Sequence, residues 1–348
     1  MEMTFKSAFV AFLATVFSLN LSAQSVPVAV LQHGDDVKTF TGTTAFKEAM
    51  DAAESGDLIS LSAGVFQFVD ITKAVKIQGV GYVQDEENGR YRTTLDLLYK
   101  GGDNSFINIP ENEEGLYVEG VYFSSNTNRN VRAQGVLNQF VFKNCYFGSL
   151  RFGYGMGRFE SEMGLIENCK IGRLMTGNVK NLSINNSVIN FFTISDDDTP
   201  SINHCVITDQ ITSYGAGLFQ NSLLHKLAPK STDQYYNNVI LHVSNSTDLI
   251  TPNIQGNIIY TTGQEDEYCS YFQDPTHGNT FDVSYDYKLT DEAASMYISN
   301  DGTQVGIYGG EKPFTDVPSN PQITAKQIAT QSDADGKLSV KITVEAQK

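Results

Sequence analysis

Several residue types are scarce in this sequence, and each shortage narrows the range of partners and sites. The 348 residues include no Trp, five His, and 24 Lys and Arg against 40 Asp and Glu, which gives a formal net charge of −16. Such an acidic surface repels polyanions, so we expect neither nucleic acid nor an anionic membrane as a partner. The His residues are scattered without the spacing of metal ligands, which argues against a zinc site.

Long apolar runs are also missing, apart from one at the start of the chain. Residues 1–23 combine a positive charge at Lys6, a largely apolar run over Ala8–Leu21 and a small residue, Ala23, at the expected cleavage edge. The run is short, so this pattern predicts a secretory signal peptide rather than a membrane span. We therefore expect an exported protein without a membrane span in its mature form, located in the periplasm, on the cell surface or outside the cell.

One feature is abundant instead, a short phrase that recurs seven times between residues 142 and 260. Each copy begins with an apolar residue, usually has Asn at its third position and ends in a β-prone run. The copies are Phe142–Gly148, Ile166–Gly172, Ile184–Asn190, Ile202–Thr208, Phe219–His225, Tyr235–Leu241 and Ile254–Tyr260. Consecutive copies lie 16 to 24 residues apart, which is too short for a helix pair and fits one coil of a parallel β-helix.

Residues at the same phase of successive coils should stack, because neighbouring strands of a sheet lie about 4.8 Å apart. The third position forms a column of Asn residues with two departures, His204 and Gly256. Asn tolerates the left-handed backbone conformation, so we interpret this column as a structural ladder at a turn. The fourth position holds small residues, and it should face the core together with the position two residues later.

Cysteine is scarce as well, with four residues in the chain. In an exported protein this number would allow two disulfides. However, Cys145, Cys169 and Cys205 all occupy the inward fourth position, and stacking alone does not supply the torsion angles of a disulfide. We therefore expect these three to be buried free thiols. Cys269 is expected in a loop, without an obvious partner.

The position between the two inward ones should point outward, and from the third copy onward it is apolar. It holds Val188, Val206, Leu223 and Val239 in successive copies. Because a contiguous apolar stripe usually lies under something, we hypothesise that a later segment of this chain, or a partner, covers it. One candidate is the C-terminal stretch, residues 322–348, whose alternating apolar residues predict a half-buried strand.

The stretch before the repeats, residues 41–81, predicts a helix followed by short strands. Phe46, Ala49, Met50 and Ala53 share one helical face. Such a helix can cover the open end of a solenoid, which otherwise exposes its core. The predicted strands are Leu58–Leu61, Val65–Ile71 and Ala74–Gln78.

This stretch resembles the start of the pectate-lyase-like right-handed β-helix superfamily, whose members often combine a helix with the phrases "GD.I.L.AG.Y" and "V.I.G.G". The matching residues are Gly56, Asp57, Ile59, Leu61, Ala63, Gly64, Phe66, Val75, Ile77, Gly79 and Gly81. The resemblance implies an all-β fold, a right-handed parallel β-helix over residues 24–310 with an N-terminal α-helical cap and a small β appendage over residues 311–348. The superfamily includes lyases, glycoside hydrolases, esterases and non-catalytic surface proteins, so the implied partner is a polysaccharide or a cell-surface glycan.

A polar column lies four residues after the small position of the repeat. Asp209, Lys226 and His242 fall there on successive coils, and Arg173 occupies the same column two coils earlier. An elimination lyase needs a base that removes the C5 proton of a uronate and a cation that neutralises its carboxylate, and this column offers both. A hydrolase needs two carboxylates, of which the column has one. The alternative is a turn face held by surface ion pairs.

Asp196, Asp197 and Asp198 form the densest acidic run. Three carboxylates in a loop could hold calcium through oxygen ligands, and the alternative is a solvated turn. The polygalacturonase pattern of paired Asp, His-Gly and Arg-x-Lys is incomplete, because His277-Gly278 comes far too late and no Arg-x-Lys follows it. Hydrolysis of that kind is therefore not expected.

These observations leave three functional classes open. The chain is expected to be a non-catalytic polysaccharide-binding protein, a polysaccharide lyase or related carbohydrate-active enzyme, or a structural and adhesive surface solenoid. The missing catalytic motifs favour binding without catalysis. Because Trp is absent, any platform for a sugar ring must use Tyr or Phe. An acidic glycan such as pectate would need a bridging cation.

Overall fold

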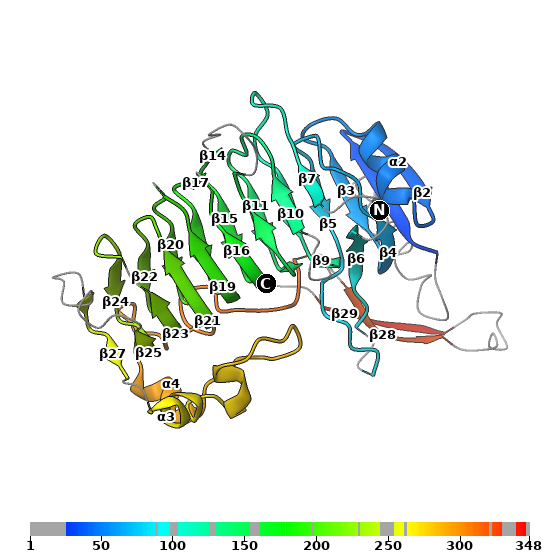
Figure 1. Cartoon of the computed structure of the whole chain (residues 1–348). Coiled ribbons are helices and arrows are strands. Elements are labelled where there is room, and N and C mark those ends of the chain that lie inside the picture. Colours follow the sequence, from blue (N-terminus) through cyan, green and yellow to red (C-terminus); the bar gives the residue numbers. More distant parts are fainter. Residues whose placement is uncertain are drawn as a thin grey trace.

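Two long β-sheets dominate the computed structural model of the chain (Figure 1). The predicted signal peptide, residues 1–23, lies outside the described residues. The structure describes residues 26–87, 90–97, 104–124, 130–153, 161–177, 179–196, 198–228, 230–243, 254–260, 263–319, 322–328 and 339–345.

Sheet 1 contains 12 strands within these described ranges. All its neighbouring strands are parallel except for β1, which pairs antiparallel with β2 and β3. In spatial order the strands are β2 (Asp36–Thr41), β1 (Val28–His33), β3 (Leu58–Leu61), β5 (Lys76–Gln78), β8 (Tyr117–Glu119), β11 (Val141–Lys143), β15 (Leu165–Glu167), β18 (Ser183–Asn185), β20 (Ser201–Asn203), β22 (Leu218–Gln220), β24 (Gln234–Tyr236) and β26 (Ile254–Gln255).

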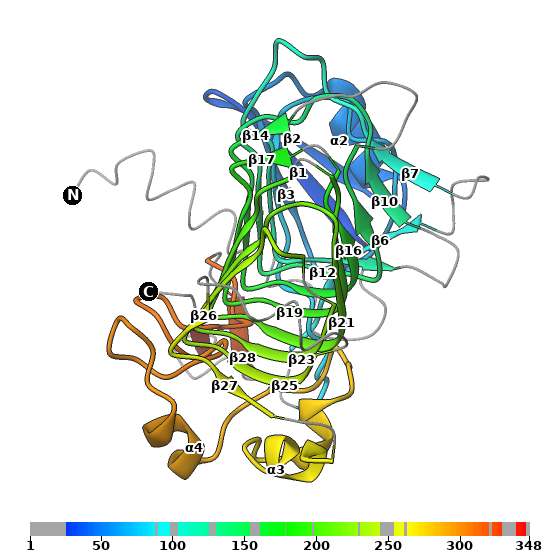
Figure 2. The ribbon, with the colours of Figure 1, turned by 60° about the vertical axis from the view of Figure 1, so that its left-hand side comes forward.

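Sheet 2 contains 13 described strands, and its pairs are parallel. Its main path is β27 (Ile258–Ile259), β25 (Val239–Val243), β23 (Leu223–Ala228), β21 (Val206–Ser213), β19 (Val188–Ile194), β16 (Lys170–Met175), β12 (Tyr146–Phe147), β9 (Val121–Ser124), β6 (Thr93–Asp96) and β4 (Gly64–Gln67). The branch strands are β13 (Leu150–Arg151), β10 (Asn130–Ala133) and β7 (Asn104–Ile107). The chain alternates between the two sheets, so its turns lie over one another (Figure 2), an arrangement consistent with a parallel β-helix.

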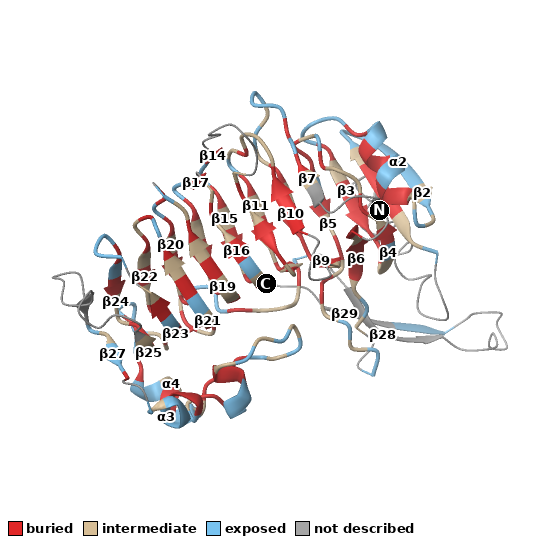
Figure 3. Cartoon of the chain, in the orientation of Figure 1, coloured by how far each residue is buried: buried red, intermediate tan, exposed pale blue. Residues whose placement is uncertain are grey.

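The hydrophobic core lies between the two sheets, and its residues repeat in register from one strand to the next (Figure 3). The prediction that the sixth position of each repeat points inward is confirmed for six of the seven copies. The buried residues there are Phe147, Ile171, Ile189, Ile207, Leu224 and Ile240. In the seventh copy Ile259 pairs in register with Ile240 but is 42% exposed, and it lies on the last described strand of sheet 2.

The turn from sheet 1 to sheet 2 is built by the Asn column, as predicted. Each member adopts the left-handed backbone conformation that Asn tolerates, with φ between 46° and 55°. His204 takes the same conformation at φ 51°, and Gly256 does so at φ 68°. The column members with this conformation are Asn144, Asn168, Asn186, His204, Asn221 and Asn237.

All four cysteines are buried free thiols. Cys145, Cys169 and Cys205 each lie 0% exposed in the core, as expected, and each Sγ donates to backbone carbonyl groups. Burial raises the pKa of Cys205 to about 12, so this thiol stays protonated at neutral pH. Cys269 was expected in a loop, but it is the last residue of the short helix α3 (Glu265–Cys269).

The N-terminal end carries the predicted helix, α2 (Ala45–Ala52), which begins after Thr44. Its apolar face is buried in the main core, as the spacing of Phe46, Ala49 and Met50 predicts. The β1–β2 hairpin that precedes it was not predicted. Predicted strand Leu58–Leu61 is β3, whereas the other two predicted strands are shorter in the structure.

The apolar stripe on the outside of sheet 2 is covered by a later segment of the same chain. Val188, Val206 and Leu223 are 0% exposed and Val239 is 1% exposed. They form a second core with residues from the segment 260–314, which carries α3, the 3-10 helix η2 (Pro275–Gly278) and α4 (Asp291–Met296) (Figures 1 and 2). The hypothesis of a covering segment is confirmed.

The C-terminal stretch does not contribute to that cover in the described structure. Its strands β28 (Gln322–Ile328) and β29 (Val340–Glu345) pair antiparallel as a separate hairpin. A further short parallel pair joins β14 (Ser161–Glu162) and β17 (Val179–Lys180). None of the helices in the described ranges has the length and apolar character that crossing a membrane requires.

Candidate functional site

The predicted polar column lies on sheet 2, three residues beyond the covered stripe. Arg173 at its start is exposed, and its guanidinium lies 5.1 Å from the centre of the Phe191 ring on the next strand. A cation over an aromatic ring at an exposed site contributes about 0.5–1 kcal/mol. Arg173 is therefore held by its own neighbour, apart from the other three members of the column.

Asp209 and Lys226 do meet, as the spacing predicted. The Lys226 Nζ lies 3.5 Å from Asp209 Oδ1, and the two side chains are 51% and 33% exposed. Lys226 pairs in register with His242, but a bulge in β21 places Gln210, not Asp209, opposite Lys226. Asp209 and Lys226 therefore form a surface ion pair, and the imidazole of His242 lies on the next strand, in register with Lys226.

The acidic run contains one buried residue, Asp198, with Asp196 exposed and Asp197 outside the described residues. Asp198 Oδ1 accepts a hydrogen bond from the backbone N–H of Val179 at 3.0 Å, which joins two neighbouring turns. Within the described residues, no group of three or more His, Cys, Asp or Glu side chains is placed to hold a metal ion. Asp198 therefore has a structural role, because it links the backbones of two neighbouring turns.

A different site forms where the chain returns along the Asn column. We call residues 299–319 the strap. It runs along the Asn column in the direction opposite to the chain order of the column. Asn300 is hydrogen-bonded to Asn221, Asp301 to His204 and Val317 to Asn144. Asn186 Nδ2 is placed between these, and it donates at 2.8 Å to the carbonyl groups of both Ile307 and Gly309. The strap is thus bonded to the side chains of the Asn column at several successive turns, and these side chains are buried.

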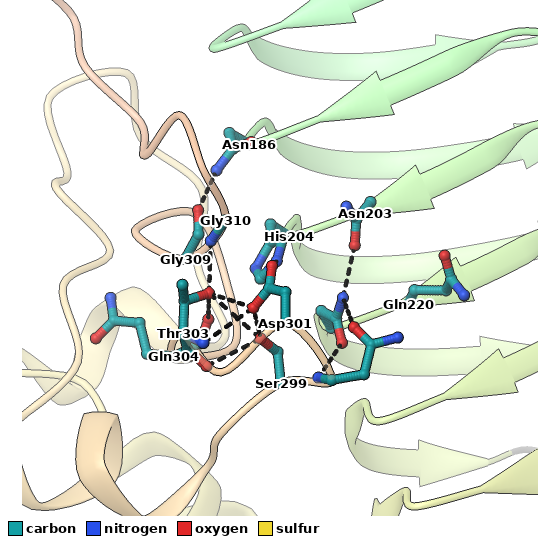
Figure 4. Close-up of polar contacts among 12 residues, drawn as sticks. Asn186, Asn203, His204, Gln220, Ser299, Asp301, Thr303, Gln304, Gly309 and Gly310 are labelled. Atoms are coloured by element: carbon teal, nitrogen blue, oxygen red, sulfur yellow. Dashed lines mark hydrogen bonds and ion pairs between the residues drawn. The ribbon is translucent and has the colours of Figure 1, made fainter.

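The most distinctive contact of the strap joins His204 to Asp301 (Figure 4). The His204 ring is 1% exposed, and its Nε2 lies 2.8 Å from Asp301 Oδ2. Asp301 Oδ1 accepts from the Thr303 backbone N–H at 2.9 Å and the Thr303 hydroxyl at 2.7 Å, and also from the Ser299 hydroxyl. Burial alone would raise the pKa of Asp301, but the hydrogen bonds from Ser299, Thr303 and His204 outweigh burial and hold that pKa well below its usual range.

An open cavity of about 460 Å³ lies beside this contact, between the strap and the outer face of sheet 1. Nine of its ten lining residues carry polar or charged side chains, which is unusual for a small-molecule site and suits a ligand rich in hydroxyl groups. The lining residues are Glu167, Asn185, Asn186, Asn203, His204, Asp301, Thr303, Gly310, Glu311 and Lys312.

The floor of the cavity belongs to a longer polar row on sheet 1. The last residues of successive strands stack in register there, outside the core. This row is Lys143, Glu167, Asn185, Asn203, Gln220 and Tyr236. Because strands are about 4.8 Å apart, the row presents a polar group at that interval along the stack.

The sequence reasoning did not identify this cavity. The sequence pattern marks His204 only as a departure from the Asn column, and it assigns no role to Asp301. A signal was present, since His at a left-handed turn position can reach a partner that Asn is too short to reach. The partner itself lies 97 residues away and carries no repeat, so spacing could not reveal it.

Comparisons with known proteins add no assignment. A scan against protein-family models, a search of curated proteins and a search of solved structures each found no match to this chain.

Proposed function

We propose that this chain is an exported, right-handed parallel β-helix protein of the pectate-lyase-like type, and that it binds polysaccharide without cleaving it. In this proposal, α2 and the β1–β2 hairpin cap the first coil. The cavity between sheet 1 and the strap is the binding site, and the polar row on sheet 1 continues it along the molecule.

The observation that supports binding is the composition of the cavity and its position on a repeating row. Carboxylate, amide and hydroxyl groups offer both donors and acceptors to sugar hydroxyl groups. A row repeated from strand to strand can contact successive sugars of one chain, whereas a site for a single small molecule needs no such extension. A fold alone does not assign a function, and the polar cavity supports carbohydrate binding independently of the fold.

The test is a panel of soluble polysaccharides with the mature protein, with and without calcium. Affinity gels would report binding, and absorbance of unsaturated ends and assays of reducing ends would report cleavage. We expect retardation in at least one gel without new ends. Absence of retardation and of cleavage on every glycan would overturn the proposal in favour of a structural or adhesive solenoid.

A lyase is the second candidate, and one observation favours it. Lys226 and His242 are paired across adjacent strands, and Asp209 lies beside Lys226. New unsaturated ends in the panel would support this candidate, and Lys226→Ala and His242→Ala should then abolish them. If cleavage persists in both variants, the sheet 2 column is not the catalytic site.

A further inference from the structure

We infer that the cavity between sheet 1 and the strap accepts neutral or amino-bearing glycans and rejects polyuronates. This inference rests on the proposed polysaccharide binding and names its ligand class. It follows from the charges that line the cavity, from a buried imidazole at its wall and from the row that extends it.

The lining charges are predominantly negative. Glu167, Asp301 and Glu311 contribute three carboxylates, and Lys312 contributes the one ammonium group among the lining residues in the described structure. Lys143, outside the lining, lies 3.8 Å from the Glu167 carboxylate, which leaves Asp301 and Glu311 against Lys312. Recognition of a uronate carboxylate would need a cation, with Arg as the residue best suited to bind it in a bidentate manner. The cavity offers a single Lys, within a chain of net charge −16, so a polyuronate would be repelled both locally and at long range.

The same carboxylates suit hydroxyl and ammonium groups, which are hydrogen-bond donors. The low pKa of Asp301 keeps it ionised at neutral pH, and its Oδ2 accepts one protein bond, from His204, among those found in the described structure. A carboxylate oxygen can accept more than one hydrogen bond. Asp301 is 38% exposed, so this acceptor is within reach of a ligand.

His204 shows that the cavity wall is more than an acidic surface patch. Its ring lines the cavity and is almost fully buried, yet its Nδ1 has no hydrogen-bond partner within the described residues. That nitrogen is closed off from solvent and faces Gly309 of the strap, where an added Cβ would clash with it, so it is not the atom that meets a ligand. The bond from Nε2 to Asp301 instead fixes the ring and the carboxylate that together line the cavity (Figure 4).

The row on sheet 1 supplies the aromatic contact that the cavity lacks. Asn203, Gln220 and Tyr236 lie on three successive strands in register. The Tyr236 hydroxyl bonds Gln234 on the same strand, and the phenol ring remains part of the outer face. A glycan that fills the cavity and follows the row would therefore reach a ring on which a sugar can stack, two strands from Asn203.

The experiment compares three probes on the intact mature protein by affinity gels and calorimetry: hydroxyethyl cellulose, a chitosan oligosaccharide and polygalacturonate. We expect binding of the first or second, with polygalacturonate weaker by about tenfold or more. Glu311→Lys should weaken chitosan binding about tenfold and improve polygalacturonate binding, and the adjacent Lys312→Glu should do the reverse. Both positions are exposed on the strap, so neither change should alter folding, which circular dichroism would check.

The outcomes separate this inference from the proposed function. If polygalacturonate binds as tightly as the other two, polysaccharide binding stands and the inference on ligand class fails. If none of the three probes binds, the inference fails, and the full polysaccharide panel decides the proposed function. Lys38→Glu on β2 serves as the control, since the same change of charge at an exposed position outside the cavity lining should leave all three affinities unchanged. A loss of binding in that variant, with no effect at Glu311 and Lys312, would place the site away from the cavity and overturn the inference.

Discussion

The outer face of sheet 2 is covered and that of sheet 1 is partly open, although both sheets are built from similar short strands. On sheet 2 the outward column holds Val188, Val206, Leu223 and Val239, and a later segment buries it. On sheet 1 the outward row is polar, and it stays partly open beside a cavity. The inward residues of the repeats are apolar at the sixth position and, apart from Ile259 on the last described strand, buried. The outward column alone therefore decides whether a face becomes a second core or a surface that is free to bind.

The boundary between the two faces is the turn occupied by the Asn column. The strap runs along this column and is bonded to it at several coils, with the covered face on one side and the open row on the other. One segment thus closes sheet 2 and forms a wall of the cavity on sheet 1. Stability of the cover and binding in the cavity should respond to different substitutions, and the predictions below use that separation.

The largest effect is expected from a charge on the covered face. Leu223→Asp would place a carboxylate at a position that is 0% exposed, and an unpaired buried charge should lower the free energy of unfolding by about 4 kcal/mol. Urea unfolding would measure it, and limited proteolysis should show cleavage between residues 263 and 319. The matched control is Gln220→Glu on the outer row of sheet 1, with an expected change below about 0.5 kcal/mol. Equal effects of the two substitutions would refute the contrast between the faces.

A smaller effect is expected at the boundary, where His204 combines a left-handed backbone with the bond to Asp301. His204→Val should cost about 3 kcal/mol, because a β-branched residue is strained at φ 51° and the bond is lost. His204→Asn should cost only about 1 kcal/mol, since Asn keeps the backbone conformation and loses the bond alone. The midpoints of urea unfolding would compare them. If both variants lose the same stability, the backbone conformation is not what the column selects.

These two faces also show how much of the fold can be predicted from the sequence. The repeat phrases predict the strands and the inward residues because stacking makes their chemistry periodic, and the Asn column predicts its own left-handed turns. The outward apolar column even predicts that something covers it. The identity of the cover could not be predicted, because the segment 260–314 has no repeat and its helices are short. The contact between His204 and Asp301 stayed hidden for the same reason.

The candidate site on sheet 2 shows what a sequence repeat cannot predict. Equal spacing correctly brought Asp209 next to Lys226, because both belong to the periodic part of the chain. However, spacing cannot show a bulge, and the bulge in β21 shifts Asp209 out of line with Lys226. Nor can it show that Arg173 would lie over Phe191 instead of joining the group. A column is thus predictable from a repeat, whereas the geometry within it is not.

One charged residue already occupies the covered face, and it offers a test by pH. Lys170 is 3% exposed, and its Nζ donates to the carbonyl groups of Val283, at 2.6 Å, and Tyr285. Burial lowers the pKa of Lys170 from 10.5 to about 8, while the nearby Asp316, Asp286 and Asp282 oppose that shift.

Between pH 8 and 10 the unfolded chain therefore binds more protons at this lysine than the folded chain, so stability should rise with pH. From pH 7.5 to 9.5 this site should add about 2 kcal/mol to the free energy of unfolding, and Lys170→Met should not show that gain. Urea unfolding of both proteins over this range measures the difference. If the stability of the wild type changes with pH in the same way as that of Lys170→Met, the prediction that Lys170 is buried with a lowered pKa is wrong.

The smallest effect is expected on the exposed part of sheet 2, at the ion pair of Asp209 and Lys226. The two groups are largely or partly solvated, and such pairs contribute about 0–1 kcal/mol. Asp209→Asn, Lys226→Ala and the double variant form a cycle whose coupling energy should stay below about 0.5 kcal/mol and shrink further in high salt. A coupling of several kcal/mol would mean that the pair is far less solvated in solution than its exposure indicates. In that case sheet 2 would carry a second shielded polar site beyond its covered stripe, and the lyase candidate would regain the enclosed environment that an ionisable catalytic group requires.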